Sequence, residues 1–228
     1  LSVFAVCDGK NYKVLNTAQD HKRACDGDLG PNTGGMGAYS PTPLSTDIMI
    51  EQTCANIIEP TLKAMNDKGH PYTGFLYVGL MIVNNLPYVI EYNVRMGDPE
   101  TQVVLPLLES SLFELLHKAS IGSLLDVKFE ISDKTAVTVV LASKGYPKQY
   151  AKNMEIKMNT NDNDLVFHAG TKIDGDILYT TGGRVLNVVG FGKNLKNAIS
   201  NAYEIAERIE FKNKYLRLDI GQKGLGYK

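Results

Sequence analysis

Runs of β-branched and aromatic residues, interrupted by short turn sequences, predict two hairpins in the first part of the chain. The first is SVFAVCDGKNYKVLN, which turns through Asp8-Gly9. The second joins FLYVGLMIV to PYVIEYN and turns through Asn84-Asn85. Short Gly- and Asn-containing turns favour the connection of adjacent antiparallel strands. Both hairpins therefore indicate antiparallel sheet.

Apolar residues at helical spacing predict helices after each hairpin. In the segment TDIMIEQTCANIIEPTLKAMNDKG the apolar positions are Ile50, Cys54, Ile57, Ile58, Leu62 and Met65. Ser45 or Thr46 is the expected cap, Gly69 the expected end, and Pro60 should kink or split the helix. The stretch LPLLESSLFELLHKASIG predicts one or two shorter helices.

A second block begins after the charged connector at 126–134. TAVTVVLAS has the pattern of a buried strand, and LVFHAGTKI, ILYTTG and RVLNVVGFG follow as further strands. NLKNAISNAYEIAERI then predicts an amphipathic helix. Hairpins followed by a packing helix indicate a small antiparallel α+β domain. We therefore expect one domain at residues 1–128 and a second at residues 129–228.

Residues 19–45 show no periodicity and are rich in Gly, Pro, Asp and Asn. Loops longer than about 12–15 residues are uncommon unless they are functional or disordered. Gly34, Gly35 and Gly37 free the backbone for close approach to a ligand, and its N–H groups can form an anion site. Valine at Gly35 or Gly37 is then expected to weaken substrate binding and to leave the melting temperature nearly unchanged. A flexible surface loop is the alternative.

Composition narrows the possible partners. The formal charge of −1 over 228 residues gives no basic field for nucleic acid. No apolar run approaches the roughly 20 residues that cross a bilayer. The three widely spaced cysteines predict reduced thiols in a cytoplasmic protein, without a zinc site. We therefore expect neither a nucleic-acid nor a membrane partner.

The segment YVIEYNVRMGDPETQ carries the clearest chemistry. Glu91, Asn93 and Arg95 share a parity, so on one strand all three side chains leave the same face. Mg²⁺ is commonly held by one or two protein oxygens together with waters and phosphates. An arginine beside it can face a transferring phosphoryl group. The simpler alternative is polar capping of an edge strand, but the following Gly-Asp-Pro turn favours a site.

Four motifs in order resemble the phosphoribosylamine–glycine ligase family of the ATP-grasp superfamily: QDHKR, GPNTGGMGAYSP, YTGFLYVGLMI and VIEYNVRMGDPETQ. GYP, VFHAGT and TGGRVL resemble the carboxy-terminal domain of that family. The resemblance runs over essentially the whole chain. It implies an α+β fold, namely the carboxy-terminal half of an ATP-grasp domain (an antiparallel sheet with helices) followed by a small antiparallel α+β domain.

The resemblance also implies a reaction. The family joins glycine to 5-phosphoribosylamine with ATP, through a glycyl phosphate, and gives glycinamide ribonucleotide, ADP and phosphate in purine biosynthesis. By this resemblance Glu91 and Asn93 ligate Mg²⁺ or Mn²⁺ and Arg95 is catalytic. Asp20 would hold the glycine ammonium group and Asp98 would line the acceptor pocket. The full set of implied substrate-binding residues is Asp20, Lys22, Gly34, Gly35, Gly37 and Asp98.

Two departures from the family pattern limit these expectations. The chain opens LSVFAVCDG, inside a strand pattern, so we expect that the amino-terminal half of the family is missing and that this piece alone is inactive. YVGLMIV offers no further acidic ligand, which many ATP-grasp enzymes carry there. The alternatives are another ATP-grasp enzyme, such as a biotin-dependent carboxylase, or a non-catalytic metal-binding remnant.

Overall fold

The computed structural model describes residues 1–226, which form two compact units. The first unit contains residues 1–19, 41–97 and 104–133. The second contains residues 20–40 and 98–103 and the chain from Lys134 onward. The division into two domains between residues 128 and 129, each able to fold independently, stays a prediction.

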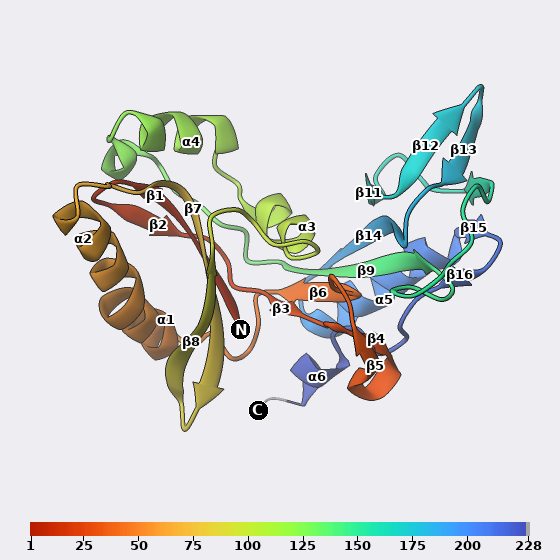
Figure 1. The fold of residues 1–228 in the computed structure, drawn as a ribbon, viewed down its shortest axis with the longest axis horizontal. Coiled ribbons are helices and arrows are strands. Elements are labelled where there is room, and N and C mark those ends of the chain that lie inside the picture. Colours follow the sequence, from red (N-terminus) through yellow and green to blue (C-terminus); the bar gives the residue numbers. More distant parts are fainter. Residues whose placement is uncertain (227–228) are drawn as a thin grey trace. The chain divides into compact units, whose positions relative to one another are not determined.

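The first unit is built on a four-stranded antiparallel sheet in the order β2-β1-β7-β8 (Figure 1). Its β1-β2 and β7-β8 pairs confirm the two predicted hairpins. Asn84 and Asn85 have φ angles of 51° and 60°, as a tight two-residue turn requires. The strands are β1 (Ser2–Asp8), β2 (Tyr12–Val14), β7 (Thr73–Val83) and β8 (Leu86–Asn93).

The predicted long helix is split, as Pro60 suggested. A π-helical segment over Cys54–Ile58 separates α1 (Asp47–Thr53) from α2 (Glu59–Asp67), and Pro60 lies in the first turn of α2. The Thr46 hydroxyl accepts a hydrogen bond from Met49 N at 3.2 Å and caps α1. One apolar cluster joins these helices to the sheet: Val3, Ala5, Cys7, Ile57, Ile58, Leu62, Leu76, Val78 and Leu80.

The remaining helical segments of this part of the chain are short. Helix α4 (Leu112–Ser120) packs against β1 and β7 and begins at Ser111, whose hydroxyl accepts from Glu114 N at 3.2 Å. The others are α3 (Thr101–Val104) and the 3₁₀ turns at Leu105–Leu107 and Leu124–Asp126. These elements match the expected short helices after the second hairpin.

The second unit is built on a larger sheet in the order β11-β14-β9-β6-β3, with β16 beside β9 (Figure 1). Helix α5 (Leu195–Glu207) packs against β14 and β9 with the apolar face that its sequence predicted. A Cβ on Gly190 would lie 2.2 Å from Ala202 N, so this glycine allows helix and sheet to approach closely. The strands are β3 (Gln19–Asp20), β6 (Gly37–Ser40), β9 (Thr135–Ser143), β11 (Leu165–His168), β14 (Arg184–Gly192) and β16 (Lys214–Tyr215).

Three two-stranded ribbons complete this unit: β4 (Arg23–Cys25) with β5 (Leu29–Asn32), β10 (Ile156–Met158) with β15 (Ile209–Phe211), and β12 (Thr171–Asp174) with β13 (Ile177–Thr180). A 3₁₀ turn covers Asp26–Asp28, and a short helix, α6, covers Gln222–Leu225. Arg217 is fully buried and pairs with Asp28 at 3.1 Å and with Asp219 at 2.7 Å. A buried guanidinium is tolerated only with such partners.

The expectation of a long loop over residues 19–45 is wrong. This segment supplies four strands, and β6 is buried along its whole length inside the sheet. Strand β6 pairs with β9, far along the chain, so its partner cannot be found from local pattern. None of the helices within residues 1–226 is both long and apolar enough to span a membrane.

Candidate functional site

Glu91 and Asn93 occupy the end of β8 and point to the same side of the first unit's sheet. Glu91 lies opposite Gly79 and Asn93 opposite Tyr77 on β7. The Asn93 side-chain amide lies 3.5 Å from Glu91 Oε1, at the outer limit of a hydrogen bond. Glu91 is exposed and Asn93 half-buried. The strand thus presents two neighbouring oxygen-bearing side chains to an approaching ligand.

Gly79 makes room for this pair. A Cβ at Gly79 would lie 3.0 Å from Glu91 Cγ, so the Glu91 side chain lies directly across the glycine. The β7–β8 register shifts between Gly79 and Leu80, which marks a bulge next to this contact. Sequence reasoning missed Gly79, although a glycine within a buried strand is a signal of close approach.

Gly79→Ala is expected to displace the Glu91 side chain without unfolding the sheet. In the full-length protein we expect the Mg²⁺ concentration for half-maximal activity to rise several-fold, since a displaced ligand weakens metal binding. Gly74→Ala is the control for backbone strain alone, because Gly74 lies on the same strand with a φ of 134° and its Cβ would have no neighbour closer than 3.7 Å. An unchanged metal requirement in Gly79→Ala would show that Glu91 does not need this space.

Arg95 does not follow the strand alternation that linked it to Glu91 and Asn93. Strand β8 ends at Asn93, and Arg95 lies in the bend beyond it. Its Nη1 donates to Met96 O at 3.0 Å, and the side chain is exposed. The premise of one continuous strand therefore fails at Arg95, since the strand stops before it, and its predicted role does not follow from alternation.

Asp20 and Lys22 form an ion pair in the second unit. Lys22 Nζ lies 2.9 Å from Asp20 Oδ2, with the Asp20 side chain only 4% exposed. The pKa of Asp20 is raised to about 7, because burial, and after it the charge of buried Glu100, outweigh the opposing effects of Lys22 and the His21 N–H. The His21 N–H itself donates to Gly37 O, and Asp20 Oδ1 is left without a hydrogen bond. This carboxyl group therefore stays protonated to a higher pH than an exposed aspartate does.

Asp20→Asn is expected to change how stability depends on pH. A pKa raised from near 4 to about 7 means that the folded protein binds the proton more tightly, so wild-type stability falls as pH rises between these values. Asparagine does not titrate. On going from pH 4 to pH 8, we expect the unfolding free energy of Asp20→Asn to rise relative to that of wild type by on the order of 1–3 kcal/mol.

Chemical denaturation at both pH values measures this difference, and Asp67→Asn, at an exposed position, is the control. A wild-type-minus-variant difference that is the same at pH 4 and pH 8 would contradict the raised pKa.

All four backbone N–H groups of residues 33–36 donate hydrogen bonds. Each N–H donates to an acceptor within the protein, so these four groups already have partners in this structure, and the predicted anion-binding role stays a prediction. Their bonds run from Thr33 N to Lys22 O at 2.8 Å, Gly34 N to the Tyr146 hydroxyl at 3.0 Å, Gly35 N to the Thr33 hydroxyl at 2.9 Å, and Met36 N to His21 O at 2.9 Å.

Two glycines of this segment are required by packing. A Cβ at Gly35 would lie 2.3 Å from Pro99 Cδ, and one at Gly37 would lie 2.6 Å from Thr138 O. Cβ atoms in proteins essentially never come within 3.0 Å of another non-bonded heavy atom. The expectation that valine at these positions leaves stability unchanged is therefore wrong, because both α-carbons lie in packed surroundings.

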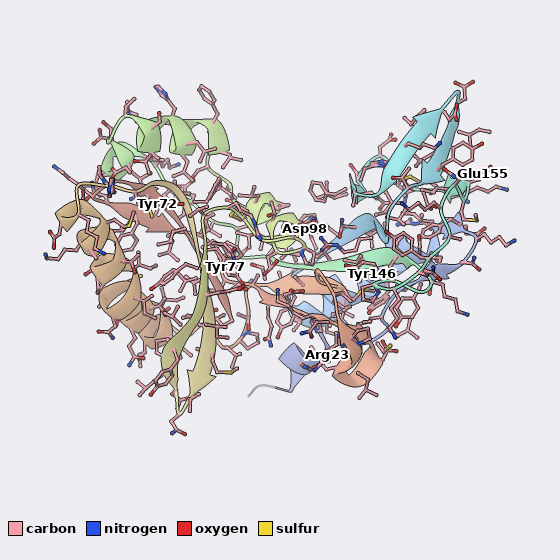
Figure 2. All side chains as sticks on the ribbon, in the orientation of Figure 1. Arg23, Tyr72, Tyr77, Asp98, Tyr146 and Glu155 are labelled. Carbon is pink, nitrogen blue, oxygen red and sulfur yellow. The ribbon has the colours of Figure 1, made fainter. Side chains whose placement is uncertain are left out.

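Asp98 is held through both carboxylate oxygens. Oδ1 accepts from Gln102 Nε2 at 3.0 Å, and Oδ2 accepts from Arg184 Nη2 at 2.9 Å. Asp98 and Tyr146, labelled in Figure 2, both belong to the second unit. Sequence reasoning gave no role to Arg184 or Tyr146, although their motifs, TGGRVL and GYP, carried part of the family resemblance.

The donors of β8 suit a hard divalent cation. Within the described residues, no three His, Cys, Asp or Glu side chains gather closely enough to hold a metal. A carboxylate and an amide oxygen match Mg²⁺, which keeps waters and substrate phosphates as its other ligands. The space over Gly79 gives Glu91 its position for this. The residues present thus fit a metal held jointly with a phosphate ligand.

Comparison with known proteins identifies the family. Residues 1–101 match the ATP-grasp (A) domain of phosphoribosylglycinamide synthetase, and residues 136–223 match its C domain. A phosphoribosylamine–glycine ligase of Chlorobaculum tepidum is 51% identical over 98% of this chain and 54% of its own length. The chain therefore spans about half the length of the curated relatives it matches.

Solved structures agree with the sequence matches. The crystal structure of a phosphoribosylamine–glycine ligase from Thermotoga maritima superposes with a TM-score of 0.88 and 39% identity, over 96% of this chain and 55% of that one. The biotin carboxylase subunit of a pyruvate carboxylase has a TM-score of 0.64 at 15% identity, over 94% of this chain and 46% of that one, which shows a shared fold alone. Together, the two domain matches, the identities and the structural agreement show that this chain belongs to the phosphoribosylglycinamide synthetase family, whose A domain has the ATP-grasp fold.

Proposed function

We propose that this chain, together with residues that it lacks, ligates glycine to 5-phosphoribosylamine in purine biosynthesis. ATP is split to ADP and phosphate, and the product is glycinamide ribonucleotide. The observation that carries the proposal is the Glu91–Asn93 pair at the end of β8, positioned over Gly79, in a chain of this family. An exposed pair of oxygen donors there fits metal-assisted use of ATP.

ATP and a divalent metal are the cofactors that the ATP-grasp family implies. We assign the metal to Glu91 and Asn93, with either Mg²⁺ or Mn²⁺ as the ion. A bound cation would neutralise phosphate charge that otherwise repels a carboxylate nucleophile. The rest of the metal shell would fall to phosphates and water, because β8 carries no other carboxylate or amide side chain.

The protein's own residues chiefly position reactants and compensate charge in this proposal. The glycine carboxylate attacks the γ-phosphorus, ADP leaves, and the amine of phosphoribosylamine then displaces phosphate from glycyl phosphate. Arg95, exposed and always charged, would face the transferring phosphoryl group. The substrate-binding roles of Asp20, Lys22, Asp98 and the glycines at 34, 35 and 37 stay predictions.

A second part of the proposal concerns what completes the site. The curated relatives are about twice as long as this chain, which supports the prediction that an amino-terminal half supplies the remaining substrate contacts. We predict that the 228-residue chain alone does not catalyse the reaction and binds ATP with a Kd no lower than about 1 mM. The cytoplasmic location inferred from three unpaired thiols also stays a prediction.

The test is a substrate-omission assay of the full-length protein. ADP release is followed with every combination of Mg²⁺, glycine and phosphoribosylamine. We expect release only when all are present, and none when bicarbonate and biotin replace the two substrates. ADP release with bicarbonate and biotin would favour the carboxylase alternative. ATP binding without release under any combination would favour a metal-binding remnant.

A further inference from the structure

Gly34 is held by side chains from much later in the chain. Its N–H donates to the Tyr146 hydroxyl at 3.0 Å, and its carbonyl accepts from Arg184 Nη1 at 2.9 Å. Glycine has no side chain to fix its own peptide groups and is the most mobile residue in an unfolded or exposed segment. Both peptide groups that flank Gly34 Cα are thus oriented from outside the segment.

Arg184 joins this segment to the turn at Asp98. The same Nη1 that reaches Gly34 O also donates to Asp98 O at 2.8 Å, while Nη2 donates to Asp98 Oδ2 at 2.9 Å. One planar guanidinium therefore engages three acceptors on two separate stretches of chain. A lysine ammonium cannot reproduce this fixed fork.

The absence of a side chain at Gly34 leaves space that the Arg184 guanidinium occupies. A Cβ at Gly34 would lie 3.0 Å from Arg184 Cζ and 3.1 Å from Nη2, so the guanidinium lies where a side chain would otherwise be. Tyr146 is fitted in the same way, since a Cβ at Gly183 would lie 2.1 Å from its ring. The glycines at 34 and 183 and the two clamping side chains make one packed set within the second unit.

We propose that Arg184 and Tyr146 are positioning residues that hold residues 33–36 and the Asp98 turn in the conformation that binds substrate. The inference rests on the proposed function and on the predicted substrate-binding roles of Gly34, Gly35 and Asp98. In this proposal Arg184 and Tyr146 raise the affinity for substrate without touching it, because they hold the residues that bind it. Fixing such a surface before binding lowers the entropy lost when the ligand arrives.

Arg184→Gln, Arg184→Lys and Tyr146→Phe test this in the full-length protein. For Arg184→Gln we expect the KM for glycine or phosphoribosylamine to rise at least tenfold, with a smaller change in kcat. Arg184→Lys should show nearly the same rise in KM as Arg184→Gln, because lysine keeps the charge but lacks the planar fork of donors. Hydrogen exchange of the amides at 33–36 should quicken at least tenfold in Arg184→Gln, and Tyr146→Phe should quicken exchange mainly at Gly34.

Arg208→Gln is the matched control. Arg208 also forms a partly buried ion pair in the second unit, 3.0 Å from Asp164, and has no bond to residues 33–36. We expect its melting temperature to fall as much as that of Arg184→Gln while its KM values stay unchanged. Equal KM effects in both variants, or unchanged exchange at Gly34 in Arg184→Gln, would overturn the proposal.

The exchange measurement keeps this inference separate from the ligase assignment. A wild-type protein without ligase activity would contradict the proposed function, yet amide exchange at 33–36 would still report whether Arg184 and Tyr146 hold the segment. Active wild-type enzyme with unaltered exchange and KM in the variants would instead contradict the positioning role alone.

Discussion

Glu91→Gln in the full-length protein is expected to lower kcat by on the order of 10²–10³-fold, about 3–4 kcal/mol of lost transition-state stabilisation. Under the proposed metal assignment, the change removes one charged donor and keeps the shape of the side chain. Because Glu91 is exposed at the end of β8, it contributes little to the folded core, and the melting temperature should change by no more than a degree or two. Asn93→Ala should show the same pattern with a smaller loss.

Steady-state kinetics over a range of Mg²⁺ concentrations measure this effect, with thermal unfolding beside them. Glu51→Gln is the control, since Glu51 is an exposed glutamate on α1 of the same unit. Near-wild-type turnover of Glu91→Gln at limiting Mg²⁺ would show that Glu91 is not a metal ligand. A large loss of stability would assign it a structural role.

Gly37→Val is expected to destabilise the second unit by about 3–5 kcal/mol, enough to leave a large part of the protein unfolded at physiological temperature. Its Cβ would lie 2.6 Å from Thr138 O and 2.8 Å from Ile220 Cγ2. Strand β6 is paired with β9 at this point, Gly37 opposite Val139, so the backbone cannot move away without breaking the sheet.

Urea denaturation measures the loss, and Gly175→Ala separates its causes. Gly175 has a φ of 62° and open space around its Cβ position, so alanine there should cost only about 1 kcal/mol of backbone strain. A Gly37→Val variant no less stable than Gly175→Ala would contradict the packing described for β6.

Local pattern was sufficient where an element's partner lies next to it in sequence. The turns at Asp8-Gly9 and Asn84-Asn85 connect strands that pair directly, so alternation and turn chemistry predicted both hairpins. Pro60 split the first helix for a reason that is local to the backbone. The apolar face of α5 was equally predictable, because one face of this helix packs against one sheet.

Prediction failed where partners are distant. Strand β6 looked like a glycine-rich loop because its partner strand is the distant β9. Its Gly37 packs against Thr138 and Ile220, and the preceding Gly35 packs against Pro99. Arg95 was placed by parity, but a strand's last residue depends on the turn that follows it. Glu91 and Asn93 were singled out from donor chemistry, and their metal-binding role stays a prediction. Gly79, Tyr146 and Arg184 were given no role, because their contacts depend on tertiary packing.

The most direct test follows the oxygen of glycine through the reaction. Full-length protein is given glycine labelled with ¹⁸O in its carboxylate, together with ATP, Mg²⁺ and phosphoribosylamine, and the phosphate released is analysed by mass spectrometry. The account predicts one ¹⁸O atom in each phosphate, because the carboxylate oxygen that attacks the γ-phosphorus leaves with it when the amine displaces phosphate from glycyl phosphate. Product formation with unlabelled phosphate would contradict it.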